Sequence, residues 1–275
     1  MDKIGFIGLG SMGGALLQSL LKYGAFSQKE VLVSTRTKEK IKGFISNFPD
    51  VTIMNSNTEL AGNSRTIFIC VKTGDVREIL LEIKPYLQPD HHLITISGGL
   101  TIRNIAKIFD GKLTKIVPSI ICEAGKSVTL FLHTPSVTAQ EASRVEKWLS
   151  CLGLVKVIDE DHFEIGADLT SCAPAFMASI LKHFVQAGIK HSRFTQREVE
   201  EMVLMTFLGT AKLLYENKKG LDELITGVAT KGGITEEGLK VLDEHLPYVF
   251  NELLEATLKK HQSGKSSMDS MFTQS

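Results

Sequence analysis

Near its amino terminus the chain reads Ile4-Gly5-Phe6-Ile7-Gly8-Leu9-Gly10-Ser11-Met12-Gly13. The residues up to Gly8 are apolar enough for a buried strand, and apolar residues recur at helical spacing over 15–23. A second strand pattern follows at 31–34. A strand, a glycine-rich turn, a helix and a strand within about 35 residues predict a βαβ unit whose turn has the pattern G-x-G-x-x-G.

The three glycines of this turn have separate physical uses. Gly8 permits the tight turn after the strand, Gly10 lets the backbone approach a pyrophosphate, and Gly13 lets the helix pack closely on the strand. Amide groups at the helix start, at Ser11 and Met12, are placed to bind phosphate oxygens. The pattern and its context therefore predict a dinucleotide site. The alternative is a glycine turn with a purely structural role.

The end of the second strand bears on which dinucleotide is bound. An NAD site usually has Asp or Glu at this place, whereas the chain reads Ser34-Thr35-Arg36-Thr37-Lys38 and has no carboxylate in this run. The hydroxyl groups of Ser34 and Thr37 and the guanidinium of Arg36 suit a 2′-phosphate. We therefore expect NADP(H) to be preferred over NAD(H). The alternative is a solvated basic turn.

Further cofactor contacts are expected where later strands end. Strand patterns cover 66–71, 92–97 and 115–118. The carboxyl ends of parallel strands share one edge of a sheet, and the nicotinamide half of a dinucleotide lies along that edge. The candidate residues at these ends are Val71, Lys72, Ser97, Gly98 and Pro118. For Lys72, an exposed lysine without a role is the alternative.

The order of the elements predicts two domains. Strand and helix patterns alternate up to about residue 160, and helical periodicity dominates after that point. We predict an α/β fold, with a Rossmann-type doubly wound parallel sheet at 1–162 and an all-α domain at 163–261. Two of its helices are expected at 235–246 and 247–260. The tail 262–275 is rich in Ser, Met and Gln without a period, and we expect it to be disordered.

Composition excludes several classes of partner. The 275 residues carry 31 Lys and Arg against 31 Asp and Glu, so the zero net charge supplies no global field for nucleic acid or an anionic membrane. No apolar run reaches the roughly 18 residues of a membrane helix, and the first residues show no signal-peptide pattern. The four cysteines form no CxxC, and the acidic run 159–164 is interpreted as a solvated connection. We expect a cytoplasmic, metal-independent protein.

A second glycine pair lies in the helical half, in the run Thr230-Lys231-Gly232-Gly233-Ile234-Thr235-Glu236-Glu237-Gly238. Thr235 is interpreted as a helix N-cap, and the two glutamates after it suit the positive end of the helix. Backbone amides at Gly232 and Gly233 are able to form a nest for a small carboxylate. An ordinary helix–helix turn is the alternative interpretation.

Six landmarks in order resemble the pyrroline-5-carboxylate reductase family, whose members use NAD(P)H to make proline. They are the stretch 4–13, Cys70-Val71-Lys72, Ile94-Thr95-Ile96-Ser97-Gly98-Gly99, Val117-Pro118, Ala173-Pro174-Ala175-Phe176 and Gly232-Gly233-Ile234-Thr235. The first landmark is generic. The ordered set at the spacing of the family is specific, and it spans nearly the whole chain.

The resemblance implies a reaction, a site and an assembly. Family members reduce the cyclic imine 1-pyrroline-5-carboxylate to L-proline by hydride transfer from the nicotinamide to the imine carbon. The helical domains of two chains interlock into a homodimer, with the substrate near the interface. The implied substrate-binding residues are Lys231, Gly232, Gly233, Ile234, Thr235 and Cys172. Thr235 matches the threonine that faces the pyrroline nitrogen and is the candidate catalytic residue.

Several positions depart from the family pattern. Ser119 stands where asparagine is usual, Phe176 replaces a tyrosine, and Lys231 replaces a proline. Cys172 falls in a run that is usually Ser-Gly-Ser-Gly. With these departures the chain looks more like the late-competence (ComER-type) paralogues of the family than like its housekeeping reductases.

Two alternatives to a reductase follow from these departures. The first is a catalytically weak or inactive Rossmann paralogue with a regulatory role. The second is a β-hydroxyacid dehydrogenase, which shares the glycine-rich start of the chain. That class needs a catalytic lysine and a nearby asparagine on the long interdomain helix, and the residues around Lys182 do not match them.

Overall fold

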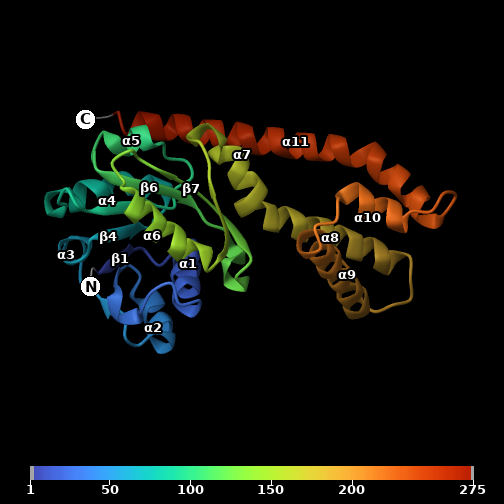
Figure 1. The fold of residues 1–275 in the computed structure, drawn as a ribbon, viewed down its shortest axis with the longest axis horizontal. Coiled ribbons are helices and arrows are strands. Elements are labelled where there is room, and N and C mark those ends of the chain that lie inside the picture. Colours follow the sequence, from blue (N-terminus) through green and yellow to red (C-terminus); the bar gives the residue numbers. More distant parts are fainter. Residues whose placement is uncertain (1–2, 274–275) are drawn as a thin grey trace. The chain divides into compact units, whose positions relative to one another are not determined.

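The structure is a computed structural model that describes residues 3–273. Two compact units divide the chain. We call residues up to Cys172 together with those from Thr257 onward the sheet unit, and Ala173–Ala256 the helical unit. The sheet unit contains every strand of the described chain (Figure 1).

One eight-stranded sheet forms the centre of the sheet unit, in the order β3-β2-β1-β4-β5-β6-β7-β8. The strands are β1 (Ile4–Ile7), β2 (Val31–Ser34), β3 (Thr52–Ile53), β4 (Thr66–Ile69), β5 (His92–Thr95), β6 (Lys112–Val117), β7 (Ser127–His133) and β8 (Gly153–Val157). The first six run parallel. The order reverses at β1, which has β2 on one side and β4 on the other. The predicted α/β fold with a Rossmann-type sheet is confirmed.

Two strands depart from the fully parallel sheet that the sequence predicted. β7 pairs antiparallel with β6, and β8 pairs parallel with β7. The connection between β6 and β7 holds only the short 3-10 helix η4 (Ile120–Ala124). A parallel return needs a crossover of about a dozen residues or more, usually an α-helix. The short connection therefore sends β7 back in the opposite direction.

Helices cover both faces of the sheet (Figure 1). They are α1 (Ser11–Lys22), α2 (Lys38–Asn47), α3 (Asn57–Asn63), α4 (Val76–Ile83), α5 (Ile102–Ala106), α6 (Ala139–Ser150) and α7 (Phe163–Ala167). α1 buries Leu17 in the hydrophobic cluster on one face, and α4 buries Leu80 in the cluster on the other. Because strand side chains alternate between faces, Phe6 of β1 joins the first cluster and Ile7 the second.

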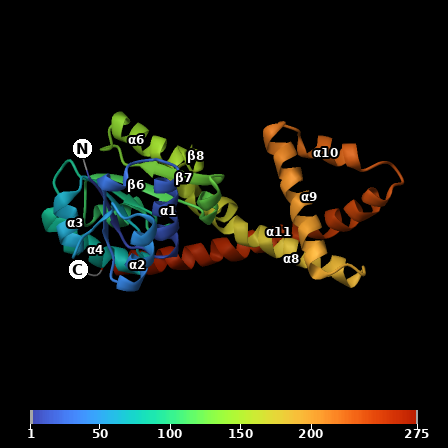
Figure 2. The ribbon, with the colours of Figure 1, turned by 90° about the horizontal axis from the view of Figure 1, so that it is seen from below.

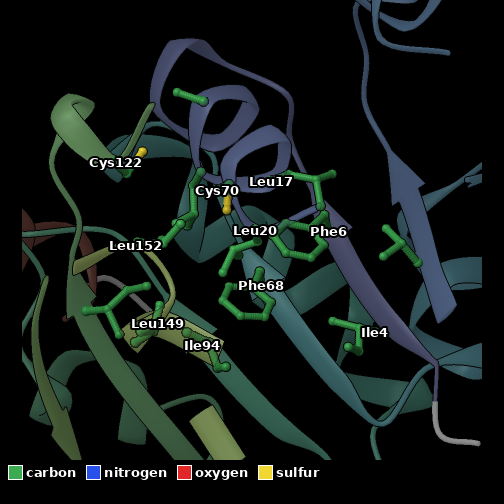
Figure 3. Packing of buried hydrophobic residues seen from close by; sticks show 14 of the residues in the cluster. Ile4, Phe6, Leu17, Leu20, Phe68, Cys70, Ile94, Cys122, Leu149 and Leu152 are labelled. Atoms are coloured by element: carbon green, nitrogen blue, oxygen red, sulfur yellow. The ribbon is translucent and has the colours of Figure 1, made fainter. Parts of the chain in front are cut away.

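The core beneath α1 is aromatic. Phe6 and Phe68, from the neighbouring strands β1 and β4, stack with their ring centroids 4.4 Å apart. Both rings are fully buried, and Figure 3 shows Leu17 and Leu20 of α1 beside them. Burying one such side chain contributes about 1.5–3 kcal/mol. This packing holds α1 on the sheet, and with it the glycine turn at the start of the helix.

The sheet unit continues past the last strand. Phe163 at the start of α7 is 1% exposed and packs with Val117 and Leu130. A π-helical turn, Asp168–Cys172, follows α7 directly. The compact units therefore divide between residues 172 and 173, beyond the predicted boundary at 162. Buried contacts decide this division, and helical periodicity in the sequence does not reveal them.

The helical unit contains α8 (Ala173–Lys190), α9 (Gln196–Glu216), α10 (Leu221–Val228) and the first part of α11 (Ile234–Met271). α8 packs against α9 (Figure 2), where Val185 and Val199 are buried. In the described residues of this unit no other side chain is buried. Most of its large apolar side chains are instead exposed, so the unit alone encloses almost no core.

α11 corrects two predictions. It runs without a break through Pro247, where two separate helices were expected. Pro247 removes one helix hydrogen bond, to the carbonyl of Asp243. Both residues are exposed, so this carbonyl is able to bond to water.

The end of α11 corrects the predicted disordered tail. The helix extends to Met271, and Phe272 is 6% exposed in a hydrophobic cluster that also includes Met268 and Met271. Asn104 of α5 donates a hydrogen bond to Asp269 at 2.8 Å. The two methionines and Phe272 recur at helical spacing, and this pattern was missed because polar residues surround it. Residues 274–275 of the predicted tail lie outside the described range.

The described residues bear on two further classes. In the range 3–273, no helix combines the length and the apolar character needed to cross a membrane. Over the same range, no group of three or more His, Cys, Asp or Glu side chains is arranged to hold a metal ion. All four cysteines are free thiols.

Candidate functional site

A cavity of about 360 Å³ lies in the sheet unit beside the glycine turn. It is lined by Ile7, Gly8, Leu9, Gly10, Ser34, Thr35, Arg36, Thr37, Asn57, Cys70, Val71, Lys72, Asp75 and Ile79. Most of these residues follow or end strands β1, β2 and β4, the three strands around the reversal of strand order, and Asn57 follows β3. In open α/β sheets, ligands bind at this reversal, outside the carboxyl ends of the strands.

Packing explains two of the three glycines of the turn. Gly8 has a φ of +97°, and a Cβ there would lie 2.8 Å from the carbonyl oxygen of Cys70. A Cβ on Gly13 would lie 2.6 Å from the Cβ of Cys70, so α1 could not approach β4 as closely. The tight turn and the close helix packing expected from the sequence are both present in the structure.

Gly10 differs from the other two glycines. The nearest atom to a Cβ built there is the carbonyl oxygen of Cys70, at 4.0 Å. Internal packing therefore gives no reason for a glycine at this position, which lines the cavity. Gly10 is also the N-cap of α1 and supplies no side-chain cap. The first amides of a helix have no partner within the helix, so this helix start faces the cavity region with amides suited to an anion.

Part of the cavity lining is polar. Arg36, just after β2, donates a hydrogen bond from Nη2 to Oδ2 of Asp75 at 2.7 Å. Ser34 donates to Oδ1 of Asn57 at 2.8 Å, and Asn57 in turn donates to Glu82 at 2.8 Å. The predicted residues Ser34, Arg36 and Thr37 therefore line one cavity together.

Asn57 and Asp75 are lining residues that the sequence reading missed. Asp75 closes the run Thr73-Gly74-Asp75 that follows the fourth strand after three residues, and Asn57 starts the helix after the third. Polar residues just beyond the carboxyl ends of parallel strands were the available signal. Only the strand order shows that these two ends meet at the cavity, because β3 and β4 lie on opposite sides of β1.

The other predicted cofactor residues divide between the cavity and its surroundings. Val71 and Lys72 line it. Ser97 donates a hydrogen bond to Thr73 at 2.8 Å, which joins the end of β5 to the segment after Lys72. Ser97 does not line this cavity, and neither do five others: Ser11 lines a second hollow that shares Leu9 and Gly10 with it, Met12 packs on the core, Gly13 lies within α1, Gly98 follows β5 and Pro118 follows β6.

Two thiols of the sheet unit are held protonated. Burial raises the pKa of Cys70 to about 12. Burial also raises the pKa of Cys172, and the neighbouring carboxylate of Asp168 adds to the effect. Asp168 is 1% exposed and accepts hydrogen bonds from Thr257 at 2.7 Å and from His261 at 3.0 Å. Because a thiolate is the reactive form, neither Cys70 nor Cys172 is activated as a nucleophile.

The second glycine pair forms a tight loop in the helical unit. Gly232 has a φ of +74°, and the amide of Gly233 donates to the carbonyl of Thr230 at 2.9 Å. The amide of Gly232 donates to the carboxylate of Glu236 at 2.5 Å. A carboxylate of the chain itself therefore occupies one amide of the predicted anion nest.

The surroundings of this loop are exposed. Ile234 is 95% exposed, and Lys231 and Thr235 are also exposed. α11 begins at Ile234, so Thr235 lies within its first turn and is not the N-cap that the sequence predicted. Gly233 precedes the helix in its place. Residue 233 is a glycine because a Cβ there would lie 2.6 Å from the side-chain oxygen of Thr230.

The fold and the cavity define the class of protein: an α/β protein with a Rossmann-type sheet and a cavity at the reversal of its strand order. Comparison with known proteins agrees with this class. Residues 3–99 match the family model described as NADP oxidoreductase, coenzyme F420-dependent. Residues 160–263 match the family model for pyrroline-5-carboxylate reductase dimerisation.

The relatives identify the family. The chain is 31% identical to pyrroline-5-carboxylate reductase 3 of Bacillus subtilis (strain 168), over 95% of this chain and 96% of the relative. It is 27% identical to ComE operon protein 4 of the same organism, over 98% and 99%. The chain belongs to the pyrroline-5-carboxylate reductase family. The resemblance predicted from the sequence, to the family and to its late-competence paralogue, is confirmed.

Solved structures show the same fold. The Plasmodium falciparum pyrroline carboxylate reductase with NADP bound matches with a TM-score of 0.86 at 24% identity, over 96% of this chain and 98% of the other. The Coxiella burnetii pyrroline-5-carboxylate reductase matches with a TM-score of 0.87 at 23% identity, over 96% and 98%. The architecture is therefore kept over nearly the full length of both chains.

Proposed function

We propose that this protein is an NADPH-dependent reductase that converts 1-pyrroline-5-carboxylate to L-proline. The observation that carries the proposal is the cavity at the reversal of strand order, in a chain of the pyrroline-5-carboxylate reductase family. The proposed substrate is inferred from the names of two relatives, which are pyrroline-5-carboxylate reductases.

The residues around the cavity fit a dinucleotide. Gly10 leaves free the space that a Cβ would fill, and the start of α1 has no side-chain cap that would compete for its amides. Gly8, Gly10, Ser11, Met12 and Gly13 would hold the pyrophosphate through backbone amides and close packing. When bound, the nicotinamide supplies the hydride that reduces the imine.

The same cavity supports a preference for NADPH. Arg36 lines it with the hydroxyl groups of Ser34 and Thr37, and the run 34–38 contains no carboxylate. A guanidinium and hydroxyl donors bind a 2′-phosphate through charge-assisted hydrogen bonds. Val71, Lys72, Ser97, Gly98 and Pro118 would position the rest of the cofactor along the strand ends.

The substrate is proposed to bind at the second glycine loop. Gly232 already holds a carboxylate, that of Glu236, through its backbone amide. This contact supports the assignment of the loop to the substrate carboxylate, because the chemistry is the same. Lys231, Gly233 and Ile234 would complete the loop, and Thr235 would orient the ring by a hydrogen bond at its nitrogen.

Cys172 is the proposed substrate contact from the sheet unit. Its thiol stays protonated beside Asp168 and is suited to line a cleft and to donate a weak hydrogen bond. Orientation of the substrate would therefore provide most of the catalysis, without a strong general base.

We propose a homodimer formed through the helical unit. Its exposed large apolar side chains include Phe184, Met205, Leu208, Tyr215, Leu221 and Tyr248. So much exposed apolar surface marks an interaction site, and the matching family model describes dimerisation. We also propose that the dimer is cytoplasmic and that it requires no metal ion, nucleic acid or membrane.

The test is a turnover assay. Purified protein with NADPH and 1-pyrroline-5-carboxylate should oxidise the cofactor and release proline, identified by mass spectrometry. Thr235→Ala should lower kcat/KM by about tenfold or more while the Kd for NADPH stays the same. Binding of NADPH without turnover at high substrate concentration would contradict the reductase and favour the regulatory paralogue.

A further inference from the structure

We infer that Asp75 sets how strongly the cavity discriminates between NADPH and NADH. The inference rests on the proposed dinucleotide site and concerns a residue that its glycine fingerprint does not include. Asp75 lies in the short 3-10 helix η2 (Thr73–Asp75), after β4, and lines the cavity together with Arg36.

The geometry puts a negative charge next to Arg36, the residue proposed to bind the 2′-phosphate. Oδ2 of Asp75 accepts a hydrogen bond from Nη2 of Arg36 at 2.7 Å. The side chain of Arg36 is 78% exposed and that of Asp75 is 34% exposed. An ion pair this exposed contributes little to folding stability. The main effect of this ion pair is therefore on the electrostatic environment of a ligand bound beside Arg36.

The pair leaves Arg36 able to bind a second anion. A guanidinium has five N–H donors in a planar fork, and this ion pair uses a donor of Nη2. A 2′-phosphate on the remaining donors would share the guanidinium with the carboxylate. Two anions at one cation repel each other. This repulsion weakens the binding of NADPH, whereas NADH has no phosphate there.

The same carboxylate favours NADH. In NAD sites an acidic residue at the end of the second strand accepts a hydrogen bond from the ribose 2′-hydroxyl. That residue type is absent from the run 34–38, and Asp75 brings a carboxylate to the same cavity from the neighbouring segment after β4. Asp75 thus opposes Arg36: one side chain favours the hydroxyl and the other favours the phosphate.

Titration calorimetry on variants tests the inference. Asp75→Asn keeps the size of the side chain and removes its charge. Glu78→Gln removes the same charge from an exposed side chain one turn further along, on α4. The Kd values for NADPH and NADH, and for the fragments 2′,5′-ADP and 5′-AMP, are measured for the wild type and both variants.

We expect Asp75→Asn to lower the Kd for NADPH and for 2′,5′-ADP by about tenfold, equivalent to about 1.4 kcal/mol. The Kd for NADH and for 5′-AMP should stay the same or rise. Glu78→Gln should change the ratio of the NADH and NADPH values by less than about twofold, because its carboxylate does not line the cavity. Asp75→Ser should reproduce the shift if the asparagine variant folds poorly.

Two results would overturn the inference. One is an unchanged ratio of the NADH and NADPH values in Asp75→Asn and Asp75→Ser, with NADPH bound by the wild type. The other is an equal change of that ratio in Glu78→Gln. A wild-type protein that binds NADPH but shows no turnover contradicts only the proposed reductase. A wild-type protein that binds neither dinucleotide contradicts both.

Discussion

The two glycine loops differ in how they are held. In the first, Gly8 and Gly13 are required by contacts with the backbone and side chain of Cys70, and the strands beneath are fully buried. In the second, a Cβ on Gly232 would meet nothing within 4 Å, and Ile234 is 95% exposed. The first loop is packed against a buried core, and the second is held only by contacts between residues that are close in the sequence.

The difference reflects how much core each unit encloses by itself. The sheet unit buries both faces of its sheet and forms the cavity from its own strand ends. The helical unit buries only Val185 and Val199 among its described residues. Its exposed apolar residues need further cover, which supports the proposed homodimer.

The largest expected effect comes from replacing a glycine by alanine in each of the two loops. Gly8→Ala should lower the free energy of unfolding of the sheet unit by at least about 3 kcal/mol, because it adds a positive-φ strain to a steric conflict with Cys70. Gly232→Ala has the positive φ but no steric conflict, and should cost about 1 kcal/mol. Urea unfolding followed by circular dichroism measures both. Equal losses would break the comparison.

The next effect tests burial in the sheet unit through pH. Burial lowers the pKa of His92 from its ordinary value of 6.5 to about 4. The unfolded chain therefore binds this proton more tightly than the folded chain does. Above pH 6.5 the group leaves the free energy of unfolding unchanged, and it reduces that energy by up to about 3 kcal/mol as the pH falls to about 4.

His92→Gln should flatten this part of the pH dependence, since glutamine does not titrate. Nε2 of His92 is hydrogen-bonded to Thr114 at 2.6 Å, and an amide is able to keep that contact. The wild type, unfolded in urea at the same pH values, is the reference. An equally steep acid loss in His92→Gln would contradict the assignment.

A smaller effect concerns the end of α11. Phe272→Ala should lower the free energy of unfolding of the sheet unit by about 2 kcal/mol, because Phe272 is buried at the edge of the core next to two methionines. Ser270→Ala, at an exposed position on the last turn, is the control. Hydrogen exchange at α5 should rise only in the phenylalanine variant. Unchanged exchange there would show that the tail does not stabilise the unit.

The smallest effect sharpens the view of the second loop. Glu236→Gln removes the charge that occupies the amide of Gly232. The substrate carboxylate would then compete with a neutral group, and KM for 1-pyrroline-5-carboxylate should fall about threefold. Glu237→Gln, at the next residue, should change KM less because Glu237 pairs with Lys240. A rise of KM in Glu236→Gln would mean that Glu236 supports substrate binding.

Much of the fold could be predicted because it depends on local patterns. Apolar runs predicted the strands at 4–8, 31–34, 66–71, 92–97 and 115–118, and the glycine run predicted the turn after the first of them. The predicted parallel direction of β7 was wrong because this direction depends on the length of one connection and not on the residues of the strand. The prediction of a disordered tail over 262–273 was wrong because Met268 and Phe272 are buried by contacts with the rest of the sheet unit, and the tail sequence does not show these contacts.

The candidate site shows the same division. Residue types at fixed places beside the first two strands indicated Gly8, Gly10, Gly13 and Arg36, since glycine and arginine have backbone and charge properties that few others share. Asp75 and Asn57 could not be predicted from their type, because an aspartate or an asparagine after a strand has many uses. Their role became visible only when the sheet brought the ends of β2, β3 and β4 around one cavity.

The sequence by itself determined the two-part architecture, the family and the phosphate-binding turn. These follow from periodicity and from residues with special backbone conformations, and both act over short distances along the chain. Only the tertiary structure decided that Asp75 faces Arg36, that Glu236 occupies the second loop and that α11 runs unbroken to Met271. Such outcomes depend on which charges and apolar surfaces meet in space, and spacing along a chain does not fix distances between its folded segments.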